Sequence, residues 1–239
     1  HMEYDEVQAD AIRKAAVSKV MVLTGGPGTG KTTTTQGIIA AYRAFGLKIL
    51  LAAPTGRAAK RMTEATGMEA QTIHRLLGIS FIGEDSRRQT FDKNEDVIII
   101  DESSMVDIVL MQALLRAVES GSRIIFVGDV DQLPSVGAGN VLKDMIRSER
   151  LKVVRLQHVF RQAQESAIIM NAPRINQGEE PVLNEEGTDF FFMRRAYADE
   201  VAGTIRELVT KRLPKFTGCD GLQDMQILTP MRKGTLGVQ

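Results

Sequence analysis

Short apolar runs alternate with longer amphipathic stretches over the first 150 residues of the chain. The runs are four to seven residues long and bounded by turn residues or charges, which is typical of buried strands. In the stretches between them, apolar residues recur every three or four positions, which predicts helices. This alternation implies right-handed crossovers and an α/β fold with a parallel sheet. The predicted strands are 20–23, 47–53, 96–100 and 123–127, and the predicted helices are 6–17, 31–45, 57–65, 71–77, 106–118 and 140–146.

Two later features depart from this regular pattern. Residues 79–91 contain two β-prone runs around the turn cluster 83–86, which predicts a small inserted β-hairpin. From about residue 151 a second unit is predicted, so the expected domains are 3–150 and 151–239, the second of them incomplete. Its predicted strands are 151–156, 189–193 and 225–229, and its predicted helices are 165–177 and 198–212.

The first apolar run leads directly into a loop with a phosphate-binding signature. Gly25-x-x-x-x-Gly30-Lys31-Thr32 fits G-x(4)-G-K-[ST] at every defined position, between a strand and a helix. Glycines let backbone N–H groups approach phosphates, and the positive end of the following helix faces the same anion. Lys31 supplies charge to the β- and γ-phosphates, and the Thr32 hydroxyl can bind Mg²⁺. The predicted ligands are ATP and Mg²⁺, and the nucleotide-binding residues are Gly26, Pro27, Gly28, Thr29, Gly30, Lys31, Thr32 and Thr33.

Acidic and amide side chains follow the third and fourth predicted strands. Asp101 and Glu102 end the third strand, a position that by itself is typical of the start of the next helix. With the phosphate loop upstream, Asp101 is expected in the Mg²⁺ shell and Glu102 is expected to orient and deprotonate the attacking water. Gln132 follows the fourth strand and can hydrogen-bond the γ-phosphate or the water. These strand ends should face one crevice at the carboxyl edge of the sheet.

The composition of the chain excludes only a few classes of protein. The net charge is zero and the pI is about 7.1, so charge does not indicate nucleic acid, although a narrow binding groove remains compatible with it. The single cysteine, Cys219, excludes an internal disulfide and suits a reducing cytoplasm. No window approaches 18 uninterrupted apolar residues, so no membrane partner is expected, and the first two residues look like a tag remnant.

Seven segments occur in the order of the motifs of one family of motor proteins. They are GGPGTGKTT (25–33), APTGRAA (53–59), TIHR (72–75), DESSM (101–105), GDVDQLP (128–134), VFRQ (159–162) and LTPMRKG (228–234). Over nearly its whole length the chain thereby resembles the RecD-like helicases of superfamily one. The segment around Gln8 resembles that family's adenine-reading motif.

The resemblance implies a mechanism and a set of residue roles. It implies two RecA-like domains with ATP between them, 5′→3′ translocation on single-stranded DNA, and duplex unwinding in recombination and repair. Lys31, Thr32, Asp101, Glu102 and Gln132 match the ATP motifs, and Arg161 matches an arginine finger that stabilises the transferring phosphoryl group. The hairpin at 79–91 matches a pin that splits the duplex at the junction. The residues that match DNA-contacting positions are Pro54, Thr55, Arg57, Thr72 and His74.

The family's last two motifs and its usual N-terminal extension are missing, so the chain is expected to be a fragment of an ATP hydrolase and DNA helicase, with very slow ATP hydrolysis and no unwinding on its own. Two other functions remain open on the residues alone. An ATPase that remodels RNA or protein is disfavoured by the segments around Thr55 and Thr72. A nucleotide-binding regulatory module is disfavoured by Glu102 and Gln132, because a protein that only binds nucleotide needs neither water activation nor γ-phosphate sensing.

Overall fold

The computed structural model describes residues 3–79, 96–185 and 187–238, without the side chains of residues 161 and 162. The chain divides into two compact units, residues 1–182 and 183–239, and each is described by itself. All but the first residue of the expected hairpin at 79–91 lies outside the described residues. The hairpin therefore stays a prediction.

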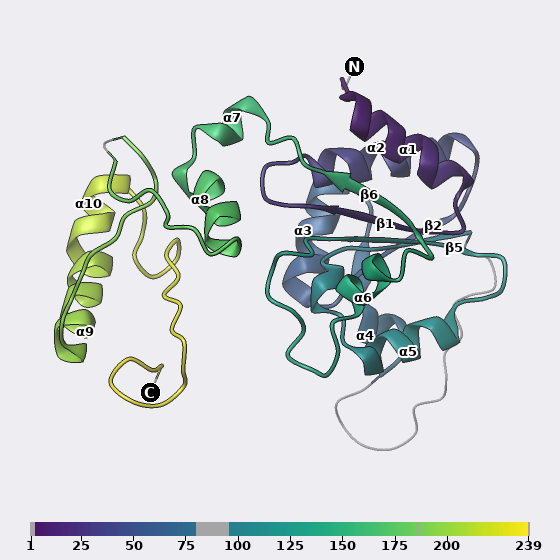
Figure 1. The fold of residues 1–239 in the computed structure, drawn as a ribbon. Helices are drawn as coiled ribbons and strands as arrows, with labels where there is room; N and C mark the ends of the chain where they lie inside the picture. Colours follow the sequence, from purple (N-terminus) through teal and green to yellow (C-terminus); the bar gives the residue numbers. More distant parts are fainter. Residues whose placement is uncertain (1–2, 80–95, 186, 239) are drawn as a thin grey trace. The chain divides into compact units, whose positions relative to one another are not determined.

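The first unit is built on a six-stranded parallel sheet (Figure 1). Its strand order is β3-β2-β4-β5-β1-β6, and each of the five pairings is parallel. Each connection therefore crosses from one end of the sheet to the other, mostly through a helix, as the alternating sequence pattern predicts. The strands are β1 (Val20–Gly25), β2 (Ile49–Ala53), β3 (Ala70–Thr72), β4 (Val97–Ile100), β5 (Arg123–Gly128) and β6 (Lys152–Leu156).

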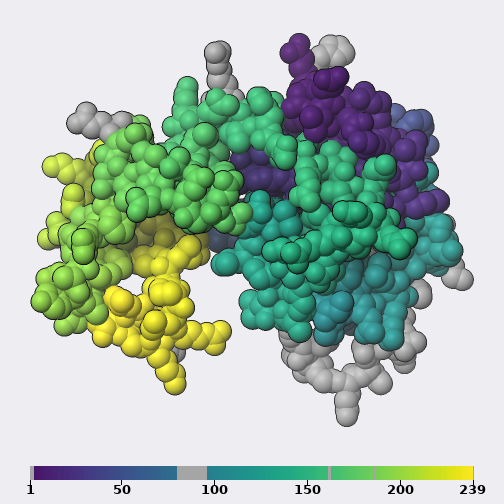
Figure 2. Space-filling model, viewed as in Figure 1, coloured from purple at the N-terminus to yellow at the C-terminus, as the bar shows by residue number. Residues whose placement is uncertain are grey.

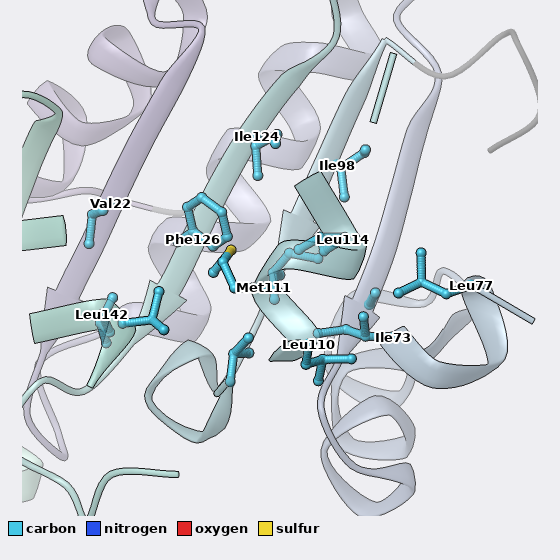
Figure 3. Packing of buried hydrophobic residues seen from close by; sticks show 14 of the residues in the cluster. Val22, Ile73, Leu77, Ile98, Leu110, Met111, Leu114, Ile124, Phe126 and Leu142 are labelled. Carbon is cyan, nitrogen blue, oxygen red and sulfur yellow. The ribbon is translucent and has the colours of Figure 1, made fainter. Parts of the chain in front are cut away.

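Helices cover both faces of this sheet, which is why the central strands are apolar throughout. Alternate residues of β1 point to opposite faces, Val22 into one hydrophobic cluster and Leu23 into the other. The first cluster packs against α4, α5 and α6, and Figure 3 shows Phe126 of β5 beside Met111 of α5 at its centre. The second packs against α1, α2 and α3. This arrangement confirms the predicted RecA-like fold for the first unit.

Five of the helices in the first unit, α1, α3, α4, α5 and α8, begin at a residue whose side chain caps them. Asp5 and Gln8 form a reciprocal capping box at the start of α1, and Thr55 accepts the N–H of Ala58 at the start of α3. The α1 helix buries only one stripe, and Figure 2 shows the rest of it, in purple, on the surface of the first unit. The helical segments are α1 (Glu6–Val17), α2 (Lys31–Ala44), α3 (Gly56–Thr66), α4 (Ile73–Leu76), η1 (Ser103–Met105), α5 (Ile108–Ala117), α6 (Val141–Arg147), α7 (Arg161–Gln164) and α8 (Ala167–Asn176).

Two elements of the first unit differ from their predictions. The segment predicted as one helix at 71–77 begins as the edge strand β3 and becomes helical only after Thr72, whose hydroxyl caps α4 by accepting the N–H of Arg75. Residues 152–156 were expected to open the second unit, but β6 pairs with β1 and completes the first sheet. The division of the chain therefore falls after Val182 and not after residue 150.

In the second unit, the regular structure of the described residues is helical and covers residues 198–217. It contains α9 (Ala198–Glu207), the π-helical turn η2 (Leu208–Arg212) and α10 (Leu213–Thr217). The strands predicted at 189–193 and 225–229 do not form here; instead the Asn184 side chain bonds both the N–H and the carbonyl of Phe192, at 2.8 and 3.1 Å. A strand needs a neighbour for its N–H and C=O groups, and the described residues of this unit contain no strand that could pair with these segments. That residues 183–239 begin a second RecA-like domain stays a proposal.

A search of the described residues for a helix that is long and apolar enough to cross a membrane finds none.

Candidate nucleotide site

The sheet order brings the predicted site residues to one edge. Because the strands are parallel, all their carboxyl ends lie together. The neighbouring strands β4, β5 and β1 lead into Asp101, into the loop that carries Gln132, and into the glycine-rich loop at residues 25–30, here called the P-loop. The next strands along the same edge, β2 and β3, lead to Thr55 and Thr72.

The P-loop has the backbone of a phosphate-binding turn. Gly28 and Gly30 have φ values of 73° and 80°, which favour glycine. Gly30 is the N-cap of α2 and supplies no side-chain cap, so the N–H groups of the first turn point toward the position of a phosphate. The Lys31 ammonium donates to the carbonyls of Gly25 and Gly26 at 2.6 and 3.0 Å, which holds it over the same turn.

A cavity of about 230 Å³ opens between α2, α3 and the end of β4, and is here called the α2–α3 cavity. Its charged lining consists of Lys31, Asp101, Glu102 and one residue that the sequence motifs did not single out, Arg61 of α3, and Thr32 lines it as well. Two cations and two carboxylates therefore share a small space. The structure places the predicted base beside the predicted phosphate ligand.

The backbone sets the direction of the Glu102 side chain. Glu102 has φ 50°, one of the few non-glycine residues of the described chain in the left-handed region. Its N–H donates to Asp101 Oδ1 at 2.8 Å, which stabilises the turn. A left-handed residue with a long side chain costs about 1–2 kcal/mol, and such outliers are concentrated at functional sites.

Burial makes both carboxyl groups stronger bases. Burial raises the pKa of Asp101, while the N–H of Glu102 and the charge of Lys31 lower it. For Glu102, burial and the charges of Asp101 and Asp129 raise the pKa, against Lys31 and Arg61, which lower it. A carboxylate with a raised pKa accepts a proton from water more readily, as a general base must.

The donors in this cavity fit Mg²⁺. Thr32 offers an exposed hydroxyl, and Asp101 offers a carboxylate of which one oxygen accepts a backbone N–H. Mg²⁺ prefers hard oxygen ligands and commonly takes one or two from the protein, the others coming from water and phosphates. Among the described residues, no cluster of three or more His, Cys, Asp or Glu side chains suited to a metal occurs.

Gln132 lies apart from this cavity. Its loop is held by buried groups: Asp129 Oδ1 accepts the N–H of Asp131 at 3.0 Å, and the hydroxyl of buried Thr24 accepts the N–H of Val130 at 3.2 Å. Gln132 itself is exposed and does not line the α2–α3 cavity. The structure therefore brings its loop, but not its side chain, to the predicted base. The supporting role of Thr24 has no signal in the sequence.

Gln8 lies on the other side of the P-loop. It is only 2% exposed, and a Cβ placed on Gly30 would collide with its amide nitrogen and lie 2.8 Å from a ring carbon of Phe160. The N–H of Phe160 donates to the Gly28 carbonyl at 3.1 Å. Arg161 follows Phe160 as the first residue of α7, but its side chain lies outside the described part of the structure. Its role as an arginine finger stays a prediction.

The five residues predicted to contact DNA lie at the ends of β2 and β3. Ala53 pairs with Thr72, so the caps of α3 and α4 start from neighbouring strands. Arg57 is exposed, and the other four, Pro54, Thr55, Thr72 and His74, are partly exposed. The Thr55 and Thr72 oxygens accept N–H groups of their own helices, which leaves the hydroxyl hydrogens able to donate to a phosphate.

Comparison with known proteins agrees with this geometry. Residues 3–190 match the family model described as an AAA domain. The chain is 39% identical over 240 residues to the ATP-dependent RecD2 DNA helicase of Deinococcus radiodurans, which covers 98% of this chain and 31% of that protein. It is 41% identical over 167 residues to the RecBCD enzyme subunit RecD of Mycolicibacterium smegmatis, which covers 59% of this chain and 30% of that protein.

Among solved structures, Pif1 of Bacteroides sp in complex with ADP-AlF4 is similar to the chain. Its TM-score is 0.50 at 25% identity, and the match covers 68% of this chain and 44% of that one. The chain spans about 30% of the length of the two curated relatives.

Proposed function

Because the chain belongs to the AAA domain family, and within it to the RecD-like helicases of superfamily one, we propose that it is an ATP-driven DNA motor. In this proposal it binds ATP with Mg²⁺, moves 5′→3′ along single-stranded DNA and unwinds duplex junctions in recombination and repair. The observation that carries the proposal is the order of the β-strands in the sheet. In this order the three segments that match ATP motifs lie beside the two segments that match DNA-contacting motifs, on one edge of the sheet. A single cysteine suits a reducing compartment, which supports the cytoplasm as its location.

Different residues of the α2–α3 cavity have different roles in ATP hydrolysis. The N–H groups of the P-loop and Lys31 bind the phosphates, and Thr32 and Asp101 would hold Mg²⁺, which neutralises phosphate charge when bound. Glu102 takes a proton from water as the water oxygen bonds to the γ-phosphorus. The bond from that phosphorus to the bridging oxygen breaks, and ADP leaves with the electron pair.

The part of the sheet edge that carries the proposed DNA contacts suits a ligand that is bound through its sugar-phosphate backbone. Hydroxyls at Thr55 and Thr72 and the guanidinium of Arg57 can contact phosphates, and such contacts carry no sequence information. A motor that moves along any sequence needs this kind of contact. The chain's zero net charge means that strand affinity must come from these local groups.

Nucleotide binding is tested by thermal unfolding with and without Mg²⁺-ADP. At a ligand concentration of about 100 times Kd, binding adds about 2.7 kcal/mol, or roughly 5–11 °C for a unit of this size. Lys31→Ala should remove this stabilisation and leave the nucleotide-free transition unchanged. Lys19→Ala is the matched control, because Lys19 precedes β1 at the opposite end and bonds the Gly121 carbonyl. Equal stabilisation of the Lys31 variant and the parent would mean that the site is misassigned.

Strand binding is tested by fluorescence anisotropy with an oligo-dT and an oligo-U of equal length. Arg57→Ala should weaken oligo-dT binding several-fold and leave Mg²⁺-ADP binding unchanged. Lys60→Ala, which removes a neighbouring exposed charge from α3, should have a smaller effect. Tighter binding of oligo-U than oligo-dT would favour an RNA-remodelling ATPase over a DNA motor.

A further inference from the structure

Helix α3 connects the two halves of the proposed site. Its first residues, after the Thr55 cap, carry Arg57 at the strand-binding part of the edge. One turn further on, Arg61 and Met62 line the α2–α3 cavity. Four residues of α-helix rise about 6 Å, so Arg57 and Arg61 move together if the helix shifts. The proposed function uses Arg57 but leaves Arg61 without a role.

Two of the other charged groups of the cavity, Lys31 and Asp101, are already engaged. Lys31 donates to two P-loop carbonyls, and one oxygen of Asp101 accepts the Glu102 N–H. In the described part of the chain, neither a hydrogen bond nor an ion pair within 4 Å holds the Arg61 guanidinium. Arg61 is therefore the cation of this cavity whose donors are available to the Glu102 carboxylate.

Glu102 needs such a partner. Its backbone is fixed in the left-handed region, but the bonds described around it hold its N–H and leave the carboxylate unheld. A general base that swings away from the attacking water loses most of its effect, and a misplacement of about 1 Å can cost 10²-fold in rate. A planar guanidinium can hold a carboxylate through two parallel hydrogen bonds.

We propose that Arg61 is a positioning residue for ATP hydrolysis, which holds the Glu102 carboxylate toward the γ-phosphate from the helix that carries the strand contacts. The inference rests on the proposed function, since it assigns Glu102 as the base. Binding of a DNA strand at Arg57 sets the position of α3, and Arg61 passes that position to Glu102. Strand binding thereby stimulates hydrolysis.

The test compares Arg61→Ala, Arg61→Lys and the control Lys60→Ala, in steady-state ATP hydrolysis with and without oligo-dT. Arg61→Ala should lower kcat about 10–100-fold with the KM for ATP within threefold, and should reduce the stimulation by oligo-dT. Arg61→Lys should retain more of the hydrolysis rate than Arg61→Ala, because lysine keeps the positive charge but cannot make the two parallel hydrogen bonds of a guanidinium. Lys60→Ala, whose exposed side chain pairs with Glu64, should behave as the parent.

Two further measurements separate positioning from other roles. Adding Arg61→Ala to Glu102→Gln should cost little more than Glu102→Gln alone, since both act through one carboxylate. A rise in KM matching the fall in kcat/KM would make Arg61 a phosphate ligand and overturn the proposal. So would fully additive losses in the double variant.

A binding measurement keeps the inference separate from the proposed function. Arg61→Ala should weaken Mg²⁺-ADP-AlF4⁻, which mimics the reacting phosphoryl group, about tenfold or more, with Mg²⁺-ADP affinity unchanged. This titration requires no turnover. A parent that binds both ligands but does not hydrolyse ATP contradicts the proposed function alone, whereas equal analogue affinity of parent and Arg61→Ala contradicts the role of Arg61.

Discussion

Replacing Gly28 by alanine tests whether the segment after β6 packs on the P-loop. Gly28 has φ 73°, and an added Cβ would lie 2.6 Å from the Cβ of Ala163 in α7 and 3.4 Å from a methyl of Ile169 in α8. Gly26, two residues earlier, is not in the left-handed region, and apart from Gly26 itself and its two chain neighbours no described heavy atom lies within 4 Å of its Cβ position. Gly26→Ala is therefore a matched control, with the same chemical change in the same loop.

The expected loss follows from two terms. A non-glycine residue in the left-handed region costs about 1–2 kcal/mol. An extra methyl in a packed contact costs about 1–3 kcal/mol more. The sum of about 2–5 kcal/mol corresponds to a Tm lower by at least about 4 °C for a unit of this size, while Gly26→Ala should change Tm by less than about 1 °C.

The assay is thermal unfolding followed by circular dichroism, without nucleotide, so that lost ligand binding does not contribute. A second variant separates the two terms. Removing the opposing methyl with Ala163→Gly should make the double variant lose less than the sum of the single losses. Equal Tm values for Gly28→Ala and Gly26→Ala would refute the packing. The Arg161 helix would then not lie against the P-loop in solution.

Two further predictions concern the base and the core. Glu102→Gln should keep Mg²⁺-ADP affinity within about twofold and lower any DNA-stimulated kcat by roughly 10²–10⁴, measured as phosphate release; near-normal turnover would place the base elsewhere. Tyr42 is buried and donates to the Ala15 carbonyl at 2.6 Å, so Tyr42→Phe should cost about 1–3 kcal/mol in urea unfolding at pH 8. Burial raises the pKa of Tyr42 from 10.0 to about 12, so its neutral form stabilises the fold fully below pH 10. That contribution is lost as the pH rises toward 12, and the difference between parent and variant should shrink between pH 9 and 11.5; a constant difference would contradict the raised pKa.

The strands and helices of the first 150 residues were predictable because both ends of each element carry local signals. Buried parallel strands are continuous apolar runs, and three of the helices between them, α3, α4 and α5, start at a capping Thr or Asp. The edge strand β3 was missed because it is three residues long and only half-buried, so no apolar run marks it. The sequence predicts a strand at β6 but assigns it to the wrong unit, because local sequence does not indicate which sheet a strand joins. Without β6, the strand β1 would have an unpaired edge beside the P-loop.

The part of the candidate site that could be predicted is the part whose residues occur at a characteristic spacing in the sequence. The P-loop residues and the Asp101-Glu102 pair stand in a pattern that a phosphate and its metal require, so the sequence predicts that they lie together, and Lys31, Thr32, Asp101 and Glu102 do line one cavity. Arg61 could not, because an arginine in the middle of an amphipathic helix normally faces solvent. Arg61 is indeed exposed, and only the packing of α3 beside α2 places its side chain at the edge of the cavity. The same holds for Ala163, whose contact with Gly28 joins residues far apart in the chain.

The sheet also limits how the strand site can influence hydrolysis. The Asp101 N–H donates to the Ala52 carbonyl at 2.9 Å, so the end of β4 is tied by a ladder bond to the strand that leads into Pro54 and Thr55. A ladder of this kind keeps the two backbones at a fixed spacing, because sliding one strand would break bonds along its whole length. DNA bound at Thr55, as proposed, would therefore not shift Asp101 by sliding β2 along β4. Helix α3 has no such ladder, and its side chains reach the cavity directly, so it is the part of this edge that can respond to one ligand and reposition a group for the other.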